Sequence, residues 1–155
     1  MQLDDALTLS FRLAEEARSN GDHPFSAVLL VDGEVAATAL NRVNSDRDLT
    51  AHAETELIRV LQREGRLDLL AAGTVVASTE PCPMCVGAMF WAGARHVVFG
   101  LSAARLGTLS TAPGASTTGF TITAGEIGGR ATPPMSVDGP HREDDAAVPH
   151  DGFWV

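Results

Sequence analysis

Two short strings, well separated along the chain, carry residue types that can bind a metal ion. The string His52–Glu54 (H-A-E) supplies an imidazole and a carboxylate, and Pro81–Cys85 (P-C-P-M-C) supplies two thiols. One imidazole and two thiolates leave the fourth tetrahedral position of zinc open for water, as in catalytic zinc sites. The spacing places Glu54 beside the metal without making it a ligand. We predict a catalytic zinc site with Glu54 as the acid–base group and with the ligands His52, Cys82 and Cys85.

Two other interpretations of these strings deserve weight. A lone Cys-x-x-Cys can be a redox pair, and a purely structural zinc normally has a fourth protein ligand. The remaining histidines could supply that ligand, but none stands at motif spacing: His23, His96, His141 and His150. A subunit that keeps zinc only for stability would have no use for Glu54. The two strings together favour catalysis.

Hydrophobic periodicity predicts the elements that must position these side chains. Apolar residues recur at helical spacing from Leu3 to Ala17, an Asp32-Gly33 turn separates two β-rich runs, and Pro83 suits the first position of a helix. Thr50 is a plausible N-cap for the helix after it. The predicted helices span about 3–20, 50–63 and 82–91, and the predicted strands span 25–31, 35–40, 74–78, 96–100 and, as a further candidate, Phe120–Thr123.

This order of helices and strands favours an α/β fold in which helices cover a mixed sheet. We expect one domain over residues 1–155, a loop at 110–118 and largely irregular structure from 131 to 150.

Residues i and i+2 of a regular helix point to opposite sides, so His52 and Glu54 can converge only at a helix start. Cys82 and Cys85, at i and i+3, share one face. The positive end of each helix dipole would favour the thiolates.

Composition limits the possible partners and compartments. The chain has 155 residues, a net charge of −9 and no lysine, so all eleven of its cations are arginines. Nucleic-acid backbones are bound through Lys and Arg, and this balance argues against such a partner. No apolar run has the roughly 18 residues of a membrane span, and the acidic N-terminus is unlike a signal peptide. We expect a cytoplasmic protein with reduced cysteines and no membrane partner.

The H-x-E…P-C-x-x-C pattern is the signature of zinc-dependent base deaminases. The chain resembles bacterial nucleobase deaminases of the cytidine deaminase superfamily over roughly residues 1–110, in Asp22–Val28, Asn41-Arg42, Thr50–Glu54 and Ser78–Gly93. The resemblance implies a three-layer α/β/α sandwich around a mixed five-stranded sheet, usually assembled as a homodimer. It also implies Zn²⁺ as cofactor and a nucleobase or nucleoside as the small-molecule partner.

The resemblance also implies a reaction, the hydrolytic removal of an exocyclic amino group from a ring. When bound, zinc lowers the pKa of a coordinated water from about 16 toward about 7. Glu54 is expected to take the water proton, pass it to a ring nitrogen and help the amine leave as ammonia.

Three branches of the superfamily compete for the substrate. The guanine deaminase branch is most similar in Phe25, Glu80–Cys85 and Trp91-Ala92 and in its aromatic C-terminal end, so a guanine-like base is the first expectation. Two departures weaken it: Ser26 replaces the usual glycine, and Leu101–Gly119 lacks the carboxylate that this branch uses in proton transfer. The alternatives are a tRNA-specific adenosine deaminase and a cytosine or cytidine deaminase.

The resemblance implies a set of substrate contacts around the metal. Asn41 matches the asparagine that hydrogen-bonds the base, although an Asn after a strand can also simply start a loop. In the guanine branch the C-terminal tail lies over the active site, so residues 131–155 are expected to form a tail in which Phe153 and Trp154 close on the base. Docking of this tail on its own core is an equal alternative. The expected substrate-binding residues are Phe25, Asn41, Ala53, Trp91 and Trp154.

Overall fold

The computed structural model describes residues 1–116 and 118–154. Its elements are α1 (Leu3–Ser19), β1 (Ser26–Val31), β2 (Glu34–Leu40), α2 (Val43–Asp46), α3 (Ala53–Arg63), α4 (Leu69–Ala72), β3 (Thr74–Thr79), α5 (Pro83–Ala92), β4 (His96–Leu101), α6 (Ala103–Ser110), α7 (Ala124–Gly129), β5 (Ser136–Asp138), α8 (Glu143–Ala147) and the 3₁₀ turn η1 (Val148–His150). Within these residues, no helix combines the length and the apolar character needed to cross a membrane.

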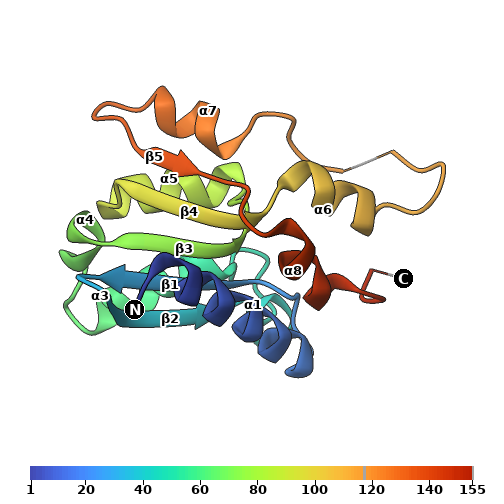
Figure 1. The fold of residues 1–155 in the computed structure, drawn as a ribbon, viewed down its shortest axis with the longest axis horizontal. Helices are drawn as coiled ribbons and strands as arrows, with labels where there is room; N and C mark the ends of the chain where they lie inside the picture. The colour runs from blue at the N-terminus through green and yellow to red at the C-terminus, as the bar shows by residue number, and fades with distance from the viewer. Residues whose placement is uncertain (117, 155) are drawn as a thin grey trace.

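The five strands form one mixed sheet in the order β2-β1-β3-β4-β5 (Figure 1). The hairpin partners β1 and β2 are antiparallel, as are β1 and β3, whereas β3–β4 and β4–β5 are parallel. A parallel pair needs a crossover connection, and α5 provides it between β3 and β4. The expected α/β sandwich with a mixed five-stranded sheet is confirmed.

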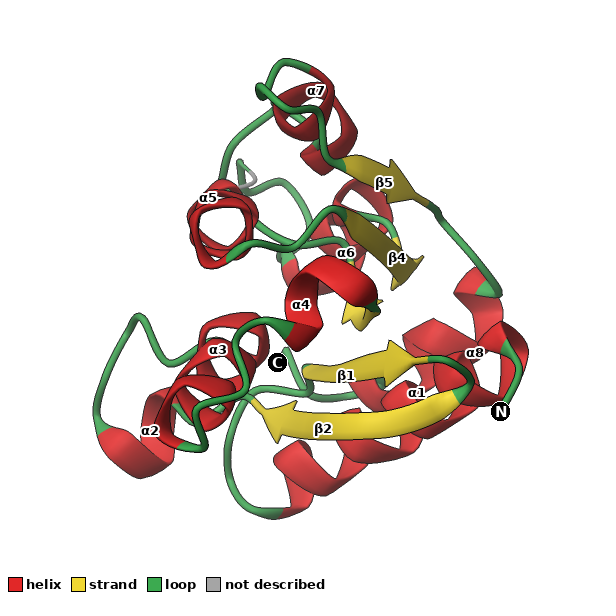
Figure 2. Cartoon of the chain, turned by 90° about the vertical axis from the view of Figure 1, so that its left-hand side faces the viewer, coloured by secondary structure: helices red, strands yellow, loops and turns green. Residues whose placement is uncertain are grey.

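Helices cover both faces of the sheet, as Figure 2 shows. On one face, α3 and α5 bury Leu57, Leu61 and Met89 against the sheet residues Leu29 and Val75. On the other face, α1 and α8 pack on alternate sheet residues, among them Val28, Val76 and Val98. Successive strand residues point to opposite faces, so one short strand can contribute to both cores.

The approach of α1 to the sheet leaves no space for a side chain at one position of β4. A Cβ at Gly100 would lie 2.5 Å from the Phe11 ring and 2.7 Å from the Ser78 carbonyl oxygen. Only glycine therefore lets β4 pass between α1 and the end of β3, where the candidate site lies.

Three expectations about the elements were wrong. Phe120–Thr123 is not a strand; Phe120 and Ile122 are exposed there, and the fifth strand is Ser136–Asp138, within the stretch expected to be irregular. That strand has a single apolar residue and therefore no detectable alternation. The N-cap of α3 is His52 rather than Thr50. In the loop expected at 110–118, Thr117 lies outside the described residues.

Candidate active site

The two sequence motifs begin two helices that lie side by side on the same face of the sheet. His52 is the N-cap of α3 and Cys82 is the N-cap of α5, both with extended backbone (φ −72° and −70°). Pro83 occupies the first turn of α5, where its missing N–H costs nothing. Cys85 follows one turn into that helix. Because the motif side chains belong to N-caps and first turns, they converge beyond the two helix ends.

The side-chain atoms of His52, Cys82 and Cys85 are spaced to hold a zinc ion. The Nδ1 atom of His52 lies 3.6 Å from the Sγ atom of Cys82 and 3.5 Å from the Sγ atom of Cys85. Zn–S bonds of about 2.3 Å and Zn–N bonds of about 2.0 Å give tetrahedral N···S edges of about 3.5 Å. All three ligand atoms lie within 4.8 Å of one another. The residues therefore fit a three-ligand zinc site.

The electrostatics of this cluster favour a metal cation. Hydrogen bonds from Cys85 and His52 lower the pKa of Cys82 to about 4, and the Cys82 thiolate in turn raises the pKa of His52. The shared hydrogen bond with Cys82 and burial raise the pKa of Cys85. Cys82 is thus the thiol of the pair that ionises more readily, and zinc ligation requires both cysteines as thiolates.

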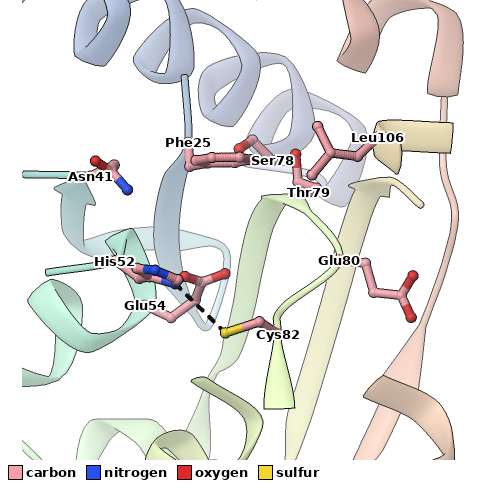
Figure 3. Close-up of a pocket in the computed structure, with 9 residues that line it drawn as sticks. All are labelled: Phe25, Asn41, His52, Glu54, Ser78, Thr79, Glu80, Cys82 and Leu106. Carbon is pink, nitrogen blue, oxygen red and sulfur yellow. Dashed lines mark hydrogen bonds between the residues drawn. The ribbon is translucent and has the colours of Figure 1, made fainter. Parts of the chain in front are cut away.

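Glu54 stands next to this cluster at the second position of α3. Its side chain is 7% exposed, and burial raises the pKa of its carboxyl, with a further contribution from the Cys82 charge. Glu54 reaches the same pocket as His52 and Cys82 (Figure 3). A buried carboxyl with a raised pKa, facing a pocket beside a metal site, is suited to taking up and releasing a proton.

The pocket in front of the cluster is small. Its volume is about 150 Å³. Its walls come from residues next to the ends of the strands β1, β2 and β3, from both metal-site motifs and from α6: Phe25, Asn41, His52, Glu54, Ser78, Thr79, Glu80, Cys82 and Leu106. An engineered apolar cavity of about 150 Å³ holds one benzene molecule. The space therefore suits a single aromatic ring.

Asn41 is buried in the pocket wall with a fixed orientation. Its Oδ1 atom accepts a hydrogen bond from the Val43 N–H at 3.1 Å, so its Nδ2 amino group is left to face the pocket (Figure 3). The Nδ2 group, which can only donate, is therefore the group that Asn41 offers to a bound molecule. Ser26, the departure from the usual glycine, points away: its hydroxyl donates to the Ser10 carbonyl of α1 at 2.6 Å. The serine side chain is therefore accommodated in the core and does not face the pocket.

Carboxylates tie the C-terminal elements to the site. Glu80, which directly precedes Pro81, accepts hydrogen bonds from the N–H groups of Ala103 at 2.8 Å and Ala124 at 3.1 Å, the first residues of α6 and α7. Glu143 accepts from the N–H and hydroxyl of Ser102, which lower the pKa of Glu143. The sequence of Leu101–Gly119 contains no carboxylate. In the fold, Glu143 at the start of α8 places a carboxylate beside Ser102 of this stretch.

The C-terminal residues pack behind Phe25 as an aromatic cluster, defined as His23, Phe25, His150, Phe153 and Trp154. The Phe25 ring lies 5.3 Å from the His150 ring and 6.0 Å from the Trp154 ring between centroids. The Trp154 indole N–H donates to Nδ1 of His150 at 3.0 Å. Arg18 of α1 holds this tail by donating to the carbonyls of Pro149 and Asp151.

The expected substrate contacts separate into three groups. Phe25 and Asn41 line the pocket, and Trp154 touches Phe25 from behind. Ala53 is fully buried beside His52 at the start of α3. Trp91 is 85% exposed and lines a different groove, between α5 and α7.

Four lining residues escaped sequence reasoning. Ser78, Thr79 and Glu80 had a usable signal, because they directly precede the second metal-binding string. Leu106 had none, because α6 was not predicted.

Comparisons with known proteins place the chain in a family. Residues 1–101 match the family described as the cytidine and deoxycytidylate deaminase zinc-binding region. Together with the three-ligand zinc site and the α/β/α sandwich, this match defines a hydrolytic zinc enzyme. The chain belongs to the cytidine and deoxycytidylate deaminase family.

Individual relatives differ in their named substrates. The chain is 40% identical over 146 residues to a probable cytosine deaminase of Schizosaccharomyces pombe, a match covering 94% of this chain and 88% of the relative. It is 40% identical over 76 residues to the guanine deaminase of Bacillus subtilis, which covers only 49% of each protein. The structure of a guanine deaminase from Nitrosomonas europaea superposes with a TM-score of 0.79 at 22% identity, over 98% of this chain and 84% of that one. This last likeness concerns the fold alone.

Proposed function

We propose that the chain deaminates a free, single-ring aminated base of the cytosine type, with water replacing the amino group and ammonia leaving. The observation that carries this proposal is the pocket of about 150 Å³ that adjoins both Glu54 and the metal-ligand cluster. Its volume suits one aromatic ring and lies below the roughly 300 Å³ at which pockets for larger ligands begin. The extensive match to a probable cytosine deaminase supports the same class of substrate.

Each pocket residue has a role in this proposal. Glu54 accepts a proton from the attacking water and delivers it to the ring nitrogen beside the reacting carbon. It then takes the remaining proton from the hydroxyl group formed on that carbon and delivers it to the amine, so the C–N bond breaks, ammonia leaves and the carbon keeps a carbonyl. Asn41 donates from Nδ2 to a carbonyl of the base, and Phe25 packs on the ring. His52, Cys82 and Cys85 hold the zinc ion, which supplies the Lewis acid.

Guanine is the second candidate. A groove of about 280 Å³ adjoins the pocket and shares Glu80, Cys82 and Leu106 with it, so movement of α6 would make room for a second ring. The aromatic C-terminal end and the guanine deaminase relative also favour this substrate. Against it stands the absence of any carboxylate in the sequence of Leu101–Gly119.

A tRNA substrate has less support, because the chain is acidic and nearly half of its arginines are paired with carboxylates. Five of the eleven arginines are ion-paired with aspartate or glutamate: Arg42, Arg59, Arg66, Arg105 and Arg142. With a net charge of −9, the chain offers little to neutralise phosphates.

Ammonia release by the zinc-loaded protein tests the proposal. The panel holds cytosine, guanine, adenine, cytidine, guanosine and a tRNA anticodon stem-loop, with Glu54→Gln as the blank. We expect the highest kcat/KM on cytosine. Higher turnover of guanine would select the second candidate, and activity confined to the stem-loop would overturn the charge argument. Zinc binding without turnover of any of them would contradict the proposed function.

The expected homodimer is a separate proposal about the same molecule. Helix α5 is apolar around its whole circumference, yet Trp91 is 85% and Met84 39% exposed. A helix that is apolar on every side is normally buried, so a second copy is the occupant that we propose for this face. Sedimentation of the wild type and of Trp91→Glu tests it, since a dimer of this kind would dissociate in the variant.

A further inference from the structure

Three consecutive residues line the pocket at the end of β3, the last two of that strand and Glu80 after it, and among them only the middle one has a side-chain polar atom with no hydrogen-bond partner within the described residues. The hydroxyl of Ser78 accepts from the Ser26 N–H at 3.0 Å, and both carboxylate oxygens of Glu80 accept from helix N-termini. Thr79 between them is 4% exposed and lines the pocket. Its Oγ1 atom has no hydrogen-bond partner among the described residues.

An unpaired buried hydroxyl is costly and uncommon, so its location matters. Among the described residues only two buried side-chain atoms lack a partner, Oγ1 of Thr79 and Nε2 of His150. His150 lies in the aromatic cluster behind Phe25, whereas Thr79 is in the pocket wall itself (Figure 3). A molecule bound in the pocket is therefore positioned to satisfy the Thr79 hydroxyl.

The hydrogen-bonding groups of the pocket determine which atom of a base would bond to the Thr79 hydroxyl. Away from its reacting carbon and ring nitrogen, free cytosine presents one carbonyl, an acceptor, and one ring N–H, a donor. The uncommitted group of Asn41 can only donate, which matches the carbonyl. The ring N–H needs an acceptor, and the Thr79 hydroxyl offers two unused lone pairs. Figure 3 draws the two side chains on different walls of the pocket.

We propose that Thr79 is a specificity-determining residue whose hydroxyl accepts a hydrogen bond from the ring N–H of the free base. This inference rests on the proposed function and deepens it. The same ring nitrogen carries the sugar in a nucleoside, so the contact would favour a free base over its nucleoside. The mechanism is the usual one for polar selectivity: an analogue without the N–H leaves a buried group unpaired.

The test pairs two variants with two substrates. Thr79→Val keeps the side-chain shape and removes the hydroxyl, and Thr79→Ser keeps the hydroxyl. The substrates are cytosine and 1-methylcytosine, which lacks the ring N–H. We expect Thr79→Val to lower kcat/KM on cytosine about 10-fold, the usual scale of one lost hydrogen bond. The preference for cytosine over 1-methylcytosine should shrink by a similar factor, and Thr79→Ser should restore both.

Thermal unfolding without substrate separates this role from a structural one. Removing an unpaired buried hydroxyl should leave the Tm of Thr79→Val equal to or above that of the wild type. Ser26→Ala is the matched control: it removes a buried, paired hydroxyl that points away from the pocket, so it should lower Tm while the preference between the two substrates stays the same. Unchanged kcat/KM and preference in Thr79→Val would overturn the inference. A wild type that deaminates no base in the panel would overturn the proposed function, and this inference with it.

Discussion

The metal-binding part of the chain, residues 1–101, and the C-terminal part, residues 102–154, differ in how many apolar side chains they bury. In the first part, α3 and α5 bury apolar side chains against the sheet, and Cys85 is fully buried. In the second, α6 buries no residue completely, and α7 buries only Ala124 and Gly128. The C-terminal part places only a few apolar side chains in the core, Ala124, Met135, Ala146 and Ala147, and is held in addition by long-range hydrogen bonds from Glu80, Glu143 and Arg18.

We infer from this difference that the first part carries the reacting groups and the second part controls how substrate enters and is held in the pocket. The reacting groups come from the starts of two helices, α3 and α5, that bury apolar side chains in the core. Leu106, which lines the pocket, and Trp154, which contacts the Phe25 ring, belong to segments that hydrogen bonds at partly exposed positions help to hold. Regions with few buried apolar contacts open at lower free-energy cost than the core. Changes in the first part should therefore reduce kcat, and changes in the second should mainly raise KM.

The largest effect should follow removal of a metal ligand. Cys85→Ala takes one of three ligands from a buried position, so zinc content should fall below one-tenth per chain, with activity lost in proportion. The variant should also lose the part of its stability that depends on metal, because binding to the folded state alone raises Tm. Metal analysis and thermal unfolding with and without a chelator measure both effects.

Val86→Ala is the matched control for Cys85→Ala, since Val86 is equally buried on the same helix and binds no metal. It should cost about 1–3 kcal/mol in packing. A chelator should still lower its Tm, whereas the Tm of Cys85→Ala should no longer respond. A chelator response of equal size in both variants would show that Cys85 does not hold the metal.

Loss of the proton carrier should come next. Glu54→Gln should retain zinc and the fold, while kcat falls by about 10²–10⁴ because the proton transfers lose their carrier. Glu56→Gln is the control: Glu56 is equally buried on α3, but it pairs with Arg59 in a groove away from the pocket. Its kcat should stay near the wild-type value. Equal losses in the two variants would argue for a general effect on α3 rather than for chemistry at Glu54.

Breaking a tie of the C-terminal part should have a smaller effect. Glu80→Ala removes two charge-assisted hydrogen bonds to the starts of α6 and α7, each worth roughly 1.5–3 kcal/mol. We expect KM to rise about 10-fold and kcat to change less, because Leu106 loses its fixed place. Steady-state kinetics decides this, with Glu126→Ala as a control that removes only the local cap of α7. A loss in kcat without a rise in KM would show that Glu80 acts with the reacting groups and not with the C-terminal part.

The sequence predicted the metal-binding part far better than the C-terminal part, and the physical reason is locality. The metal ligands are adjacent in two short strings, and their helices and strands have clear apolar periods and a Pro83 signal. The apolar pattern alone then indicates which residues of each helix and strand face the core. The strands 26–31, 74–79 and 96–101 were therefore predicted within a residue or two.

The C-terminal elements lack such local signals. β5 is three residues long and exists because Val97 and Val98 of β4 offer it an edge, a partner that no local window contains. α6 begins at Ser102, whose hydroxyl caps it, but its residues are mostly small and none is fully buried. The ties from Glu80 and Glu143 span 23 to 44 residues of sequence. Long-range polar contacts of this kind leave no periodic pattern.

The smallest effect should be a loosening of the C-terminal tail in mild acid. Burial, helped by the charge of Arg18, lowers the pKa of His150 to about 4 from an ordinary value of 6.5, with Asp151 opposing. His23 faces the same cluster, and burial also lowers its pKa. The unfolded or detached tail therefore binds a proton near pH 6.5, while the docked tail resists it down to about pH 4. Docking is fully stabilised above about pH 6.5 and loses stability as the pH falls, by about 2 kcal/mol at pH 5.

Trp154 reports this change, because its indole donates to the Nδ1 atom that would be protonated. In a Trp91→Phe background, we expect Trp154 fluorescence to shift to longer wavelength between pH 6.5 and 4.5, with KM rising over the same range. His150→Gln cannot titrate there and should show a much flatter fluorescence curve. Arg18→Met loses two hydrogen bonds to the tail and should release it at higher pH than the wild type does. If the wild type and His150→Gln shifted together, the acid response would belong to another group, and polar ties alone would hold the tail.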